Sequence, residues 1–189
     1  EFRRVLFRSD QPMMLGYSSV GEVVESMSPD FQEGQRIVGN GPHADFGRVS
    51  ANLCAPIPDN VSDEAATFTV VGAIALQGVR LLKPTIGETY AVYGVGLIGL
   101  LAVQILLANG CKVIAVDKNP SRCALAETLG AAKACEASRE SFLDVVRDLT
   151  NGLGADGVLL ATNTRDSRVI QNSAEACRKR GRIVLVGQA

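Results

Sequence analysis

The sequence has no uninterrupted apolar run of the roughly 18–20 residues that a transmembrane helix needs. Its longest candidate, residues 92–108, is interrupted by glycines and suits a buried helix better. Tryptophan is absent, aromatic residues make up only 5%, and the net charge of −1 comes without a basic stripe. We therefore expect neither a membrane protein nor a nucleic-acid binder, since the latter needs positive charge and stacking surfaces.

The five cysteines are odd in number, widely spaced and without a C-x-x-C pair. This pattern predicts neither a disulfide framework nor a zinc knuckle, and it favours a reducing cytoplasm. Residues 1–9, EFRRVLFRS, have no long apolar region or cleavage site of a signal peptide. They resemble a foreign leader, the conceptual translation of sequencing-adapter DNA, or else a frayed basic terminus, and they carry no fold signal.

The part of the chain up to residue 82 reads as a small β region followed by a helix. Residues 20–25, 36–39 and 45–56 form short β-branched or extended runs bounded by glycine, proline and aspartate. Capping residues at 59–64 then precede residues 65–82, which are apolar nearly all round and end before Pro84. We expect this helix to be buried between two layers.

From Gly87 onward, strand and helix patterns alternate strictly. Strands are expected at 89–93, 112–116, near 133, 158–161 and 183–186, with helices at 97–108, 120–129, about 140–150 and about 167–179. Continuously apolar strands separated by such helices predict an α/β fold with a doubly wound, Rossmann-type parallel sheet. The basic run 178–180 would then be the solvated end of the last helix.

The segment YGVGLIGL, residues 93–100, follows the first of these strands and opens the first helix. In that context G-x-G-x-x-G predicts a dinucleotide site. Gly94 would make the tight turn, Gly96 would let the backbone approach a diphosphate, and Gly99 would pack helix on strand. The amides of Leu97 and Ile98 would hold the phosphates at the helix N-terminus.

Asp117 ends the second strand, where a carboxylate can accept hydrogen bonds from both adenine-ribose hydroxyls. Its charge would repel a 2′-phosphate, so the sequence favours NAD over NADP. Lys118 and Arg122 weaken this inference, because either could pair with such a phosphate. The alternative reading of Asp117 is a solvated acid at the end of a strand.

Several motifs together resemble the medium-chain dehydrogenase/reductase family, which includes the zinc-type alcohol dehydrogenases. They are GYSSVGEVVE, FQEGQRIVG, APIPDNVSDEAA, YGVGLIGL and VIAVDKNPSR. The resemblance implies a partial GroES-like catalytic domain at 10–60, a connecting cleft helix at 61–84 and a Rossmann domain at 85–189, truncated at its C-terminus. It is similar to a bacterial subgroup with an attached C-terminal oxidoreductase domain, and it leaves a homo-oligomer open.

The chain departs from the family where zinc ligands are expected. Tyr17 and Ser18 stand in place of a His-Glu pair, and Ala73 in place of a cysteine. A zinc site needs three converging protein ligands, so we expect no catalytic zinc. Tyr17, by its position, and His43, the only histidine, are the candidates for proton transfer. Each is also open to a reading as a packing or surface residue.

Further cofactor contacts are carried over from the family by position alone. These are Ile98 beside the nicotinamide, Arg122 beside the adenine ribose, and the strand-end residues Ala161, Thr162, Val186 and Gly187. We expect an NAD-dependent oxidoreductase that acts without zinc on a small-molecule alcohol, polyol or sugar. The alternatives are a non-catalytic NAD-binding module and a zinc-free NADPH-dependent quinone or enone reductase.

Overall fold

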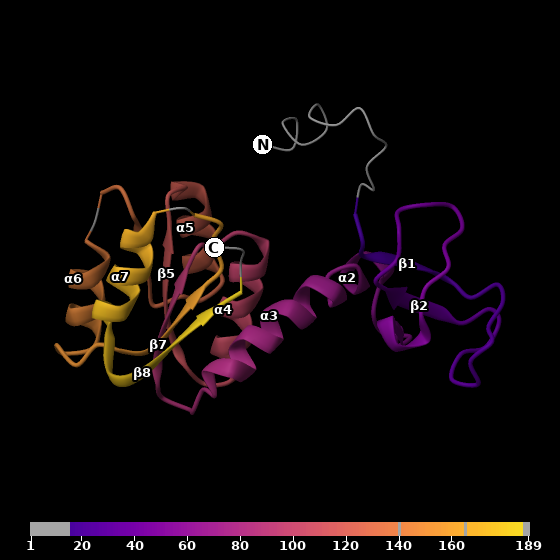
Figure 1. The fold of residues 1–189 in the computed structure, drawn as a ribbon, viewed down its shortest axis with the longest axis horizontal. Helices are drawn as coiled ribbons and strands as arrows, with labels where there is room; N and C mark the ends of the chain where they lie inside the picture. Colours follow the sequence, from indigo (N-terminus) through magenta and orange to yellow (C-terminus); the bar gives the residue numbers. More distant parts are fainter. Residues whose placement is uncertain (1–15, 140, 165, 187–189) are drawn as a thin grey trace. The chain divides into compact units, whose positions relative to one another are not determined.

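A computed structural model describes residues 16–139, 141–164 and 166–186. The chain divides into two units between Val71 and Gly72, here the N-terminal and the C-terminal unit (Figure 1). Among the described helices, none is long and apolar enough to cross a membrane. Gly187 falls outside the described residues.

The N-terminal unit contains a small antiparallel sheet, as the strand-like runs predict. Its strands, in spatial order, are β1 (Ser19–Glu22), β2 (Arg36–Gly39) and β3 (Cys54–Pro56). The expectation of one extended run over 45–56 is wrong for all but its end. Leu53 donates its amide to the Ser50 carbonyl at 2.9 Å, which closes the short 3-10 helix η1 (Ala51–Leu53) just before β3.

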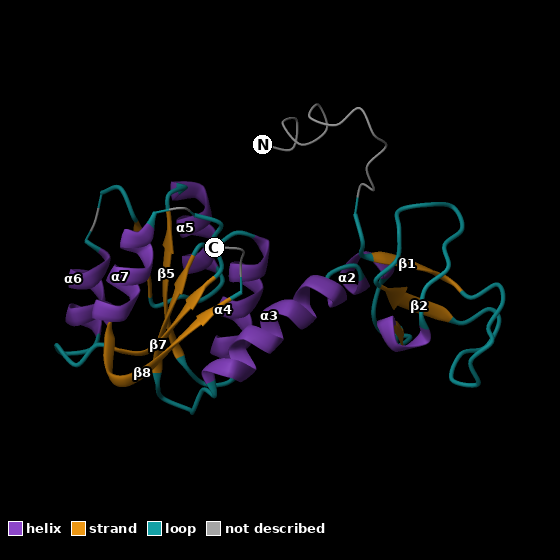
Figure 2. Cartoon of the chain, in the orientation of Figure 1, coloured by secondary structure: helices purple, strands orange, loops and turns teal. Residues whose placement is uncertain are grey.

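The single helix expected over 65–82 is divided in two (Figure 2). The first part, α2 (Asp63–Ala66), ends where the Thr67 hydroxyl donates to the Glu64 carbonyl at 2.6 Å. The second part, α3 (Thr69–Leu82), buries only the face that carries Ala75, Gly78, Val79 and Leu82. Burial on all sides was therefore a wrong prediction, because only positions spaced three and four apart face the sheet of the C-terminal unit.

The C-terminal unit is a parallel sheet with helices on both faces. In its described part five strands alternate with four helices: β4 (Thr89–Tyr93), α4 (Leu97–Ala108), β5 (Lys112–Asp117), α5 (Pro120–Thr128), β6 (Lys133–Glu136), α6 (Phe142–Leu149), β7 (Ala155–Leu160), α7 (Ser167–Ala176) and β8 (Cys177–Leu185). The spatial order is β6-β5-β4-β7-β8, so the chain reverses direction across the sheet at β4. This confirms the Rossmann-type, doubly wound prediction.

The central strands are continuously apolar because both faces of the sheet are covered. Along β5, Val113 and Ala115 pack in the cluster formed with α3, α4 and α5, whereas Ile114 and Val116 pack on the α6 and α7 side. All four side chains are fully buried. The carboxyl ends of β4, β5 and β7 consequently meet at one edge, where ligands bind in such sheets.

The basic run 178–180 is not a helix end. Helix α7 stops at Ala176, and Arg178 lies in β8, where its Nε donates to Asp156 Oδ1 at 2.6 Å. The register of β7 with β8 shifts between Ala155 and Gly157, and Arg180 adopts a φ of 67° within that irregularity. The salt bridge to Asp156 gives Arg178 a partner that a periodicity argument does not reveal.

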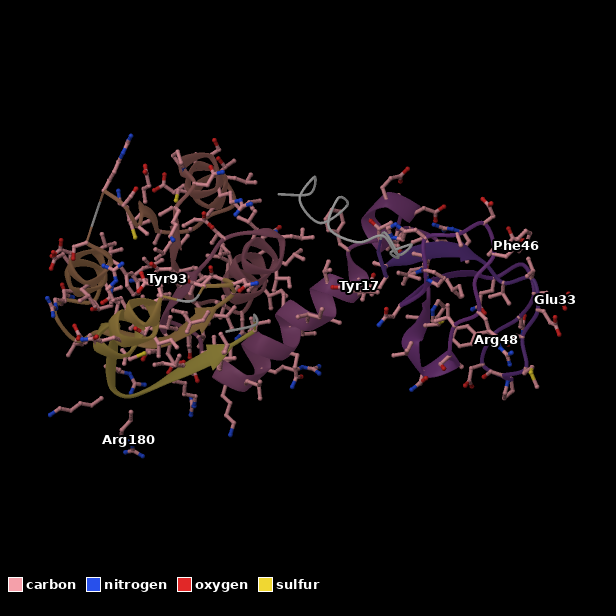
Figure 3. The ribbon with its side chains drawn as sticks, turned by 45° about the horizontal axis from the view of Figure 1, so that its top comes forward. Tyr17, Glu33, Phe46, Arg48, Tyr93 and Arg180 are labelled. Carbon is pink, nitrogen blue, oxygen red and sulfur yellow. The ribbon has the colours of Figure 1, made fainter. Side chains whose placement is uncertain are left out.

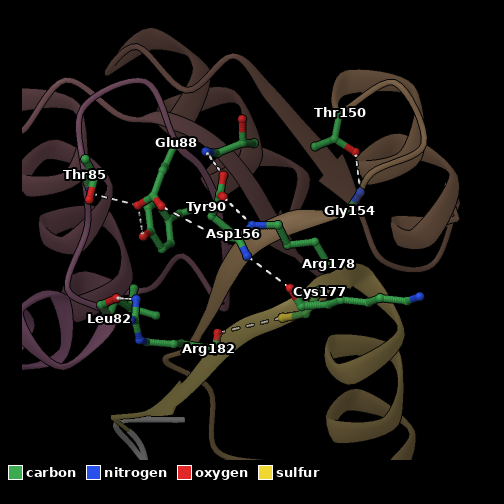
Figure 4. A network of polar contacts seen from close by, with 12 residues as sticks. Leu82, Thr85, Glu88, Tyr90, Thr150, Gly154, Asp156, Cys177, Arg178 and Arg182 are labelled. Atoms are coloured by element: carbon green, nitrogen blue, oxygen red, sulfur yellow. Dashed lines mark hydrogen bonds and ion pairs between the residues drawn. The ribbon is translucent and has the colours of Figure 1, made fainter.

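Arg178 belongs to a polar network at the amino ends of β4 and β7 (Figure 4). Asp156 Oδ2 accepts from the Thr89 amide at 2.7 Å, and the Tyr90 hydroxyl donates to Glu88 Oε2 at 2.5 Å. Arg178 Nη2 lies 3.7 Å from Glu88 Oε1, which links the two carboxylates. The network ties β4, β7 and β8 together at the end of the sheet opposite the glycine turn.

We expect the Tyr90→Phe substitution to lower the free energy of unfolding by roughly 1–3 kcal/mol at neutral pH, because a partly buried hydrogen bond to a carboxylate is lost. Burial, with the hydrogen bond to Glu88, raises the pKa of Tyr90 above its ordinary value of 10.0. Above about pH 10 the unfolded chain therefore releases this proton while the folded chain keeps it, and stability falls as the pH rises. The advantage of the wild type over Tyr90→Phe should narrow there in denaturant titrations, and a constant difference across pH 7–11 would contradict this.

Candidate functional site

The glycine turn between β4 and α4 requires glycine at its first position for reasons internal to the fold. Gly94 has a φ of 90°, and its amide donates to the Val116 carbonyl at 2.7 Å. A Cβ at this position would lie 2.8 Å from the Ala161 carbonyl oxygen. The backbone conformation and the close approach of β7 both exclude a side chain here.

The third glycine is also explained by packing. A Cβ on Gly99 would overlap the carbonyl oxygen of Gly94, one turn back. The missing side chain therefore lets α4 start directly against the turn that follows β4, as predicted for the third glycine of the motif.

The middle glycine is different, because no described residue packs closely enough to require it. Gly96 has an ordinary φ of −70°, and the nearest atom to a Cβ built on it is Arg122 Nη1 at 4.0 Å. Gly96 is also the N-cap of α4 and offers the helix no side-chain cap. The first amides of α4 lack intrahelical partners, and Leu97 is half exposed. An open backbone surface with free donors fits a diphosphate.

Asp117 faces this turn from the end of β5. Its Oδ2 accepts from the Val95 amide and its Oδ1 from the Asn119 amide, both at 2.9 Å. The residue is 8% exposed, and Arg122 Nη1 lies 3.8 Å from Oδ2. Each carboxylate oxygen can accept a second hydrogen bond, so the group remains able to bind hydroxyls. Asp117 is thus not a freely solvated acid, because its carboxylate is hydrogen-bonded to the glycine turn.

Other predicted cofactor residues lie along the same edge. The Thr162 side chain lies against Gly94, and the Ala161 amide donates to the Tyr93 carbonyl at 2.9 Å. Ile98 is half-buried and packs against the core cluster on the α4 side. Lys118 is exposed just after β5. The structure thereby brings Thr162 to the glycine turn, together with the residues already described.

Val186 follows β8 and contacts α3. Its amide donates to the Leu160 carbonyl at 2.9 Å, and its side chain packs where Gly78 leaves space. The contact with Gly78 gives Val186 a packing role in the described residues. The predicted neighbour Gly187 lies outside the residues that the structure describes.

The sequence reasoning missed two charged residues at this edge. Asp166 caps α7 by accepting from the Arg168 amide at 3.0 Å, and it pairs with Arg168 Nη2 at 2.8 Å. The hydrogen bond from the Arg168 side chain, with a smaller contribution from Lys118, lowers the pKa of the Asp166 carboxyl. An Asp-Ser pair before a helical pattern is a capping signal, so Asp166 could have been found.

Tyr93, the last residue of β4, was quoted in the motif but not predicted as a contact. Its ring packs edge-on against Phe142 with centroids 5.6 Å apart. Burial raises the pKa of its hydroxyl, and the charges of Cys135, Asp166 and Asp117 add to this. Tyr93 therefore presents an uncharged phenol at the carboxyl end of β4, on the side of the sheet that α6 covers.

In the N-terminal unit the two proton-transfer candidates are close in space. Tyr17 is half exposed and precedes β1, and His43 lies in the loop after β2. His43 Nε2 is 3.0 Å from the Ser18 carbonyl oxygen. Two positions that are 26 residues apart in the sequence thus form one cluster.

The residues at the zinc-ligand positions of the family do not fit a metal ion. Tyr17, Ser18 and Ala73 replace the expected ligands, and alanine has no donor atom. Within residues 16–139, 141–164 and 166–186, no group of three or more histidine, cysteine, aspartate or glutamate side chains could hold a metal.

The chain is similar to known dehydrogenases. The sequence model of the family described as zinc-binding dehydrogenase matches residues 98–189. An alcohol dehydrogenase of Geobacillus stearothermophilus is 28% identical over 178 residues, which are 90% of this chain and 51% of that protein. The chain thus spans about half the length of the curated relatives it matches.

Solved structures of two named activities are similar to the chain. An alcohol dehydrogenase from Thermus sp. ATN1 has a TM-score of 0.81 and 25% identity, covering 90% of this chain and 60% of its own. A mycobacterial quinone oxidoreductase has a TM-score of 0.78 and 26% identity, covering 96% and 59%. Together with the glycine turn and Asp117, these matches support a relationship to the medium-chain dehydrogenase/reductase family.

Proposed function

We propose that this chain is the dinucleotide-binding part of an NAD-dependent oxidoreductase, acting without catalytic zinc on an alcohol, polyol or sugar carbon. The single observation that carries the proposal is Gly96, whose missing side chain leaves open space at the helix N-terminus instead of serving the fold. When bound, nicotinamide supplies the hydride chemistry, and the protein supplies binding and orientation.

Different described residues would bind different parts of such a cofactor. The first amides of α4 and the helix dipole would hold the diphosphate beside Gly96. Arg122, 4.0 Å from that position and 3.8 Å from Asp117, would place a positive charge between the phosphates and the acid. Gly94 and Gly99 keep the turn tight enough for this arrangement.

The preference for NAD over NADP rests on Asp117. Its carboxylate is held in place by the Val95 and Asn119 amides, so it cannot swing aside for a 2′-phosphate without losing both bonds. A phosphate at this point would meet a nearly buried negative charge, which costs more than an exposed one. Lys118 and Arg122 offset part of this repulsion.

The substrate class is supported by the names of the relatives. Besides alcohol dehydrogenases, the similar curated proteins include a sorbitol dehydrogenase and an (R,R)-butanediol dehydrogenase of Bacillus subtilis. The second candidate function is a quinone reductase, which the mycobacterial structure and the replacement of zinc ligands by Tyr17 and Ser18 favour. Asp117 argues against it where NADPH is the donor.

Calorimetry with NAD(H) and NADP(H) tests the cofactor part of this proposal. We expect NAD(H) to bind at least about tenfold more tightly, a difference of roughly 1.4 kcal/mol. The Asp117→Asn substitution, which removes the charge but keeps the shape, should bring the two affinities within about threefold.

Glu136→Gln is the matched control, because Glu136 ends the neighbouring strand β6 opposite Asp117. The Glu136→Gln substitution should leave the ratio of the NAD(H) and NADP(H) affinities unchanged. Tighter binding of NADPH by the wild type would contradict the NAD assignment. Turnover of a quinone but of no alcohol, polyol or sugar would favour the second candidate.

A further inference from the structure

The imidazole of His43 lies directly on the backbone of Gly16. A Cβ at residue 16 would overlap the ring at Cε1 and come within 2.6 Å of Nε2 and 3.1 Å of Nδ1. Glycine at this position therefore allows the ring to rest on the chain immediately before Tyr17. Any other residue would push the ring away.

The same imidazole is fixed on the other side of Tyr17 by a hydrogen bond. Nε2 lies 3.0 Å from the Ser18 carbonyl oxygen, which can only accept. Nε2 must therefore carry a proton, and in the neutral ring Nδ1 is the nitrogen without one. The geometry thus selects one tautomer of the only histidine in the sequence.

Ser18 is in turn anchored to the end of α2. Its hydroxyl donates to the Thr67 carbonyl at 2.6 Å. The backbone of Tyr17 is consequently held between the ring contact at Gly16 and two hydrogen bonds at Ser18. The residue is 47% exposed, so the anchored backbone presents an accessible hydroxyl. Tyr17 is labelled in Figure 3.

We propose that His43 is a positioning residue for Tyr17, and that Tyr17 is the group that gives a proton to the substrate oxygen. The catalytic part rests on the function proposed above. In carbonyl reduction, a bound reduced nicotinamide would supply the hydride to the carbonyl carbon and would itself be oxidised, and the C=O π electrons would move to the oxygen. The oxygen gains the phenolic proton of Tyr17, and solvent water returns a proton to the phenolate.

The placement of the imidazole can be tested without any cofactor. Long-range ¹H–¹⁵N spectra of the full chain contain one histidine ring, and they should show the tautomer protonated at Nε2. Gly16→Ala should remove that signature by displacing the ring, whereas Asp45→Asn, in the same loop, should keep it. A ring protonated at Nδ1, or one averaging between tautomers in the wild type, would overturn the positioning role.

Kinetic measurements on His43 variants then distinguish a positioning role of His43 from direct proton transfer. His43→Ala should lower kcat by about tenfold or more, with the KM for cofactor unchanged, because a loosened phenol is misplaced. His43→Gln keeps an amide donor for Ser18 and should restore most of this loss. Equal losses in His43→Gln and His43→Ala would contradict the proposal.

Tyr17→Phe removes the proton donor and should lower kcat by about 100-fold or more. Full activity in this variant would exclude Tyr17 as the donor. Failure of the proposed function has a different signature: no binding of NAD(H) in calorimetry, with the His43 spectrum intact.

Discussion

Replacing Gly96 by valine is expected to abolish dinucleotide binding while leaving the C-terminal unit folded. The valine side chain would occupy the open space at the start of α4. Among the described residues, chain neighbours aside, only Arg122 Nη1 comes within 4 Å of a Cβ there, at 4.0 Å. Losing two hydrogen bonds to a charged diphosphate costs on the order of 3 kcal/mol, or about 100-fold in affinity. Calorimetry with NADH measures the loss.

The folded state should hardly change, because the φ of −70° at residue 96 suits any residue. Gly72→Ala is the control, since a Cβ there meets no described atom within 4 Å but lies in α3, away from the glycine turn. Wild-type affinity in Gly96→Val would show that the turn does not hold the diphosphate. A large drop in melting temperature would show that Gly96 serves the fold after all.

Replacing Gly94 by alanine should have the opposite signature, a large loss of stability. Alanine would have to adopt a φ near 90° and place its Cβ 2.8 Å from the Ala161 carbonyl oxygen. Left-handed strain and overpacking together cost roughly 2–4 kcal/mol, a large part of a typical domain's stability.

Urea titration of the Gly94→Ala protein measures that cost directly. Gly152→Ala is an informative comparison, because Gly152 has a φ of 79° but open space around it. The free energy of unfolding of Gly152→Ala should fall only by the cost of the left-handed backbone conformation. Equal losses at both positions would mean that the close approach of β7 to Gly94 contributes nothing.

The sequence predicted the strand and helix on either side of the glycine turn because local signals define them. β4 and α4 have the predicted bounds, since Gly87 precedes the strand and glycines and Asn109-Gly110 delimit the helix. The start of α5 was equally clear from Asn119 followed by Pro120. Caps, glycines and prolines act over a few residues and can be read in one dimension.

Features that depend on tertiary contacts were not predictable. β8 begins at Cys177 because Arg178 finds Asp156 and Glu88, which are far away in the sequence. The exposed face of α3 carries Leu76 and Leu81 beside its polar residues, so composition alone suggested a helix buried all round. In both cases a long-range partner, or its absence among the described residues, overrides the local pattern.

In the candidate site, too, local features could be predicted from the sequence and tertiary contacts could not. The types and spacing of Gly94, Gly96, Gly99 and Asp117 were readable, but the hydrogen bond from the Val95 amide to Asp117 was not. Likewise Tyr17 and His43 were named separately, and only the structure places the imidazole against the residues that flank Tyr17.

The most direct test of the account is an NMR titration of the ¹⁵N-labelled chain with NAD. Hydrogen bonds from the turn to a diphosphate should give the largest amide shifts at Gly96, Leu97 and Ile98. A second set should appear at Val95 and Asn119, whose amides bind Asp117. Saturation with NAD that leaves the amides of residues 95–98 unmoved would contradict the central claim.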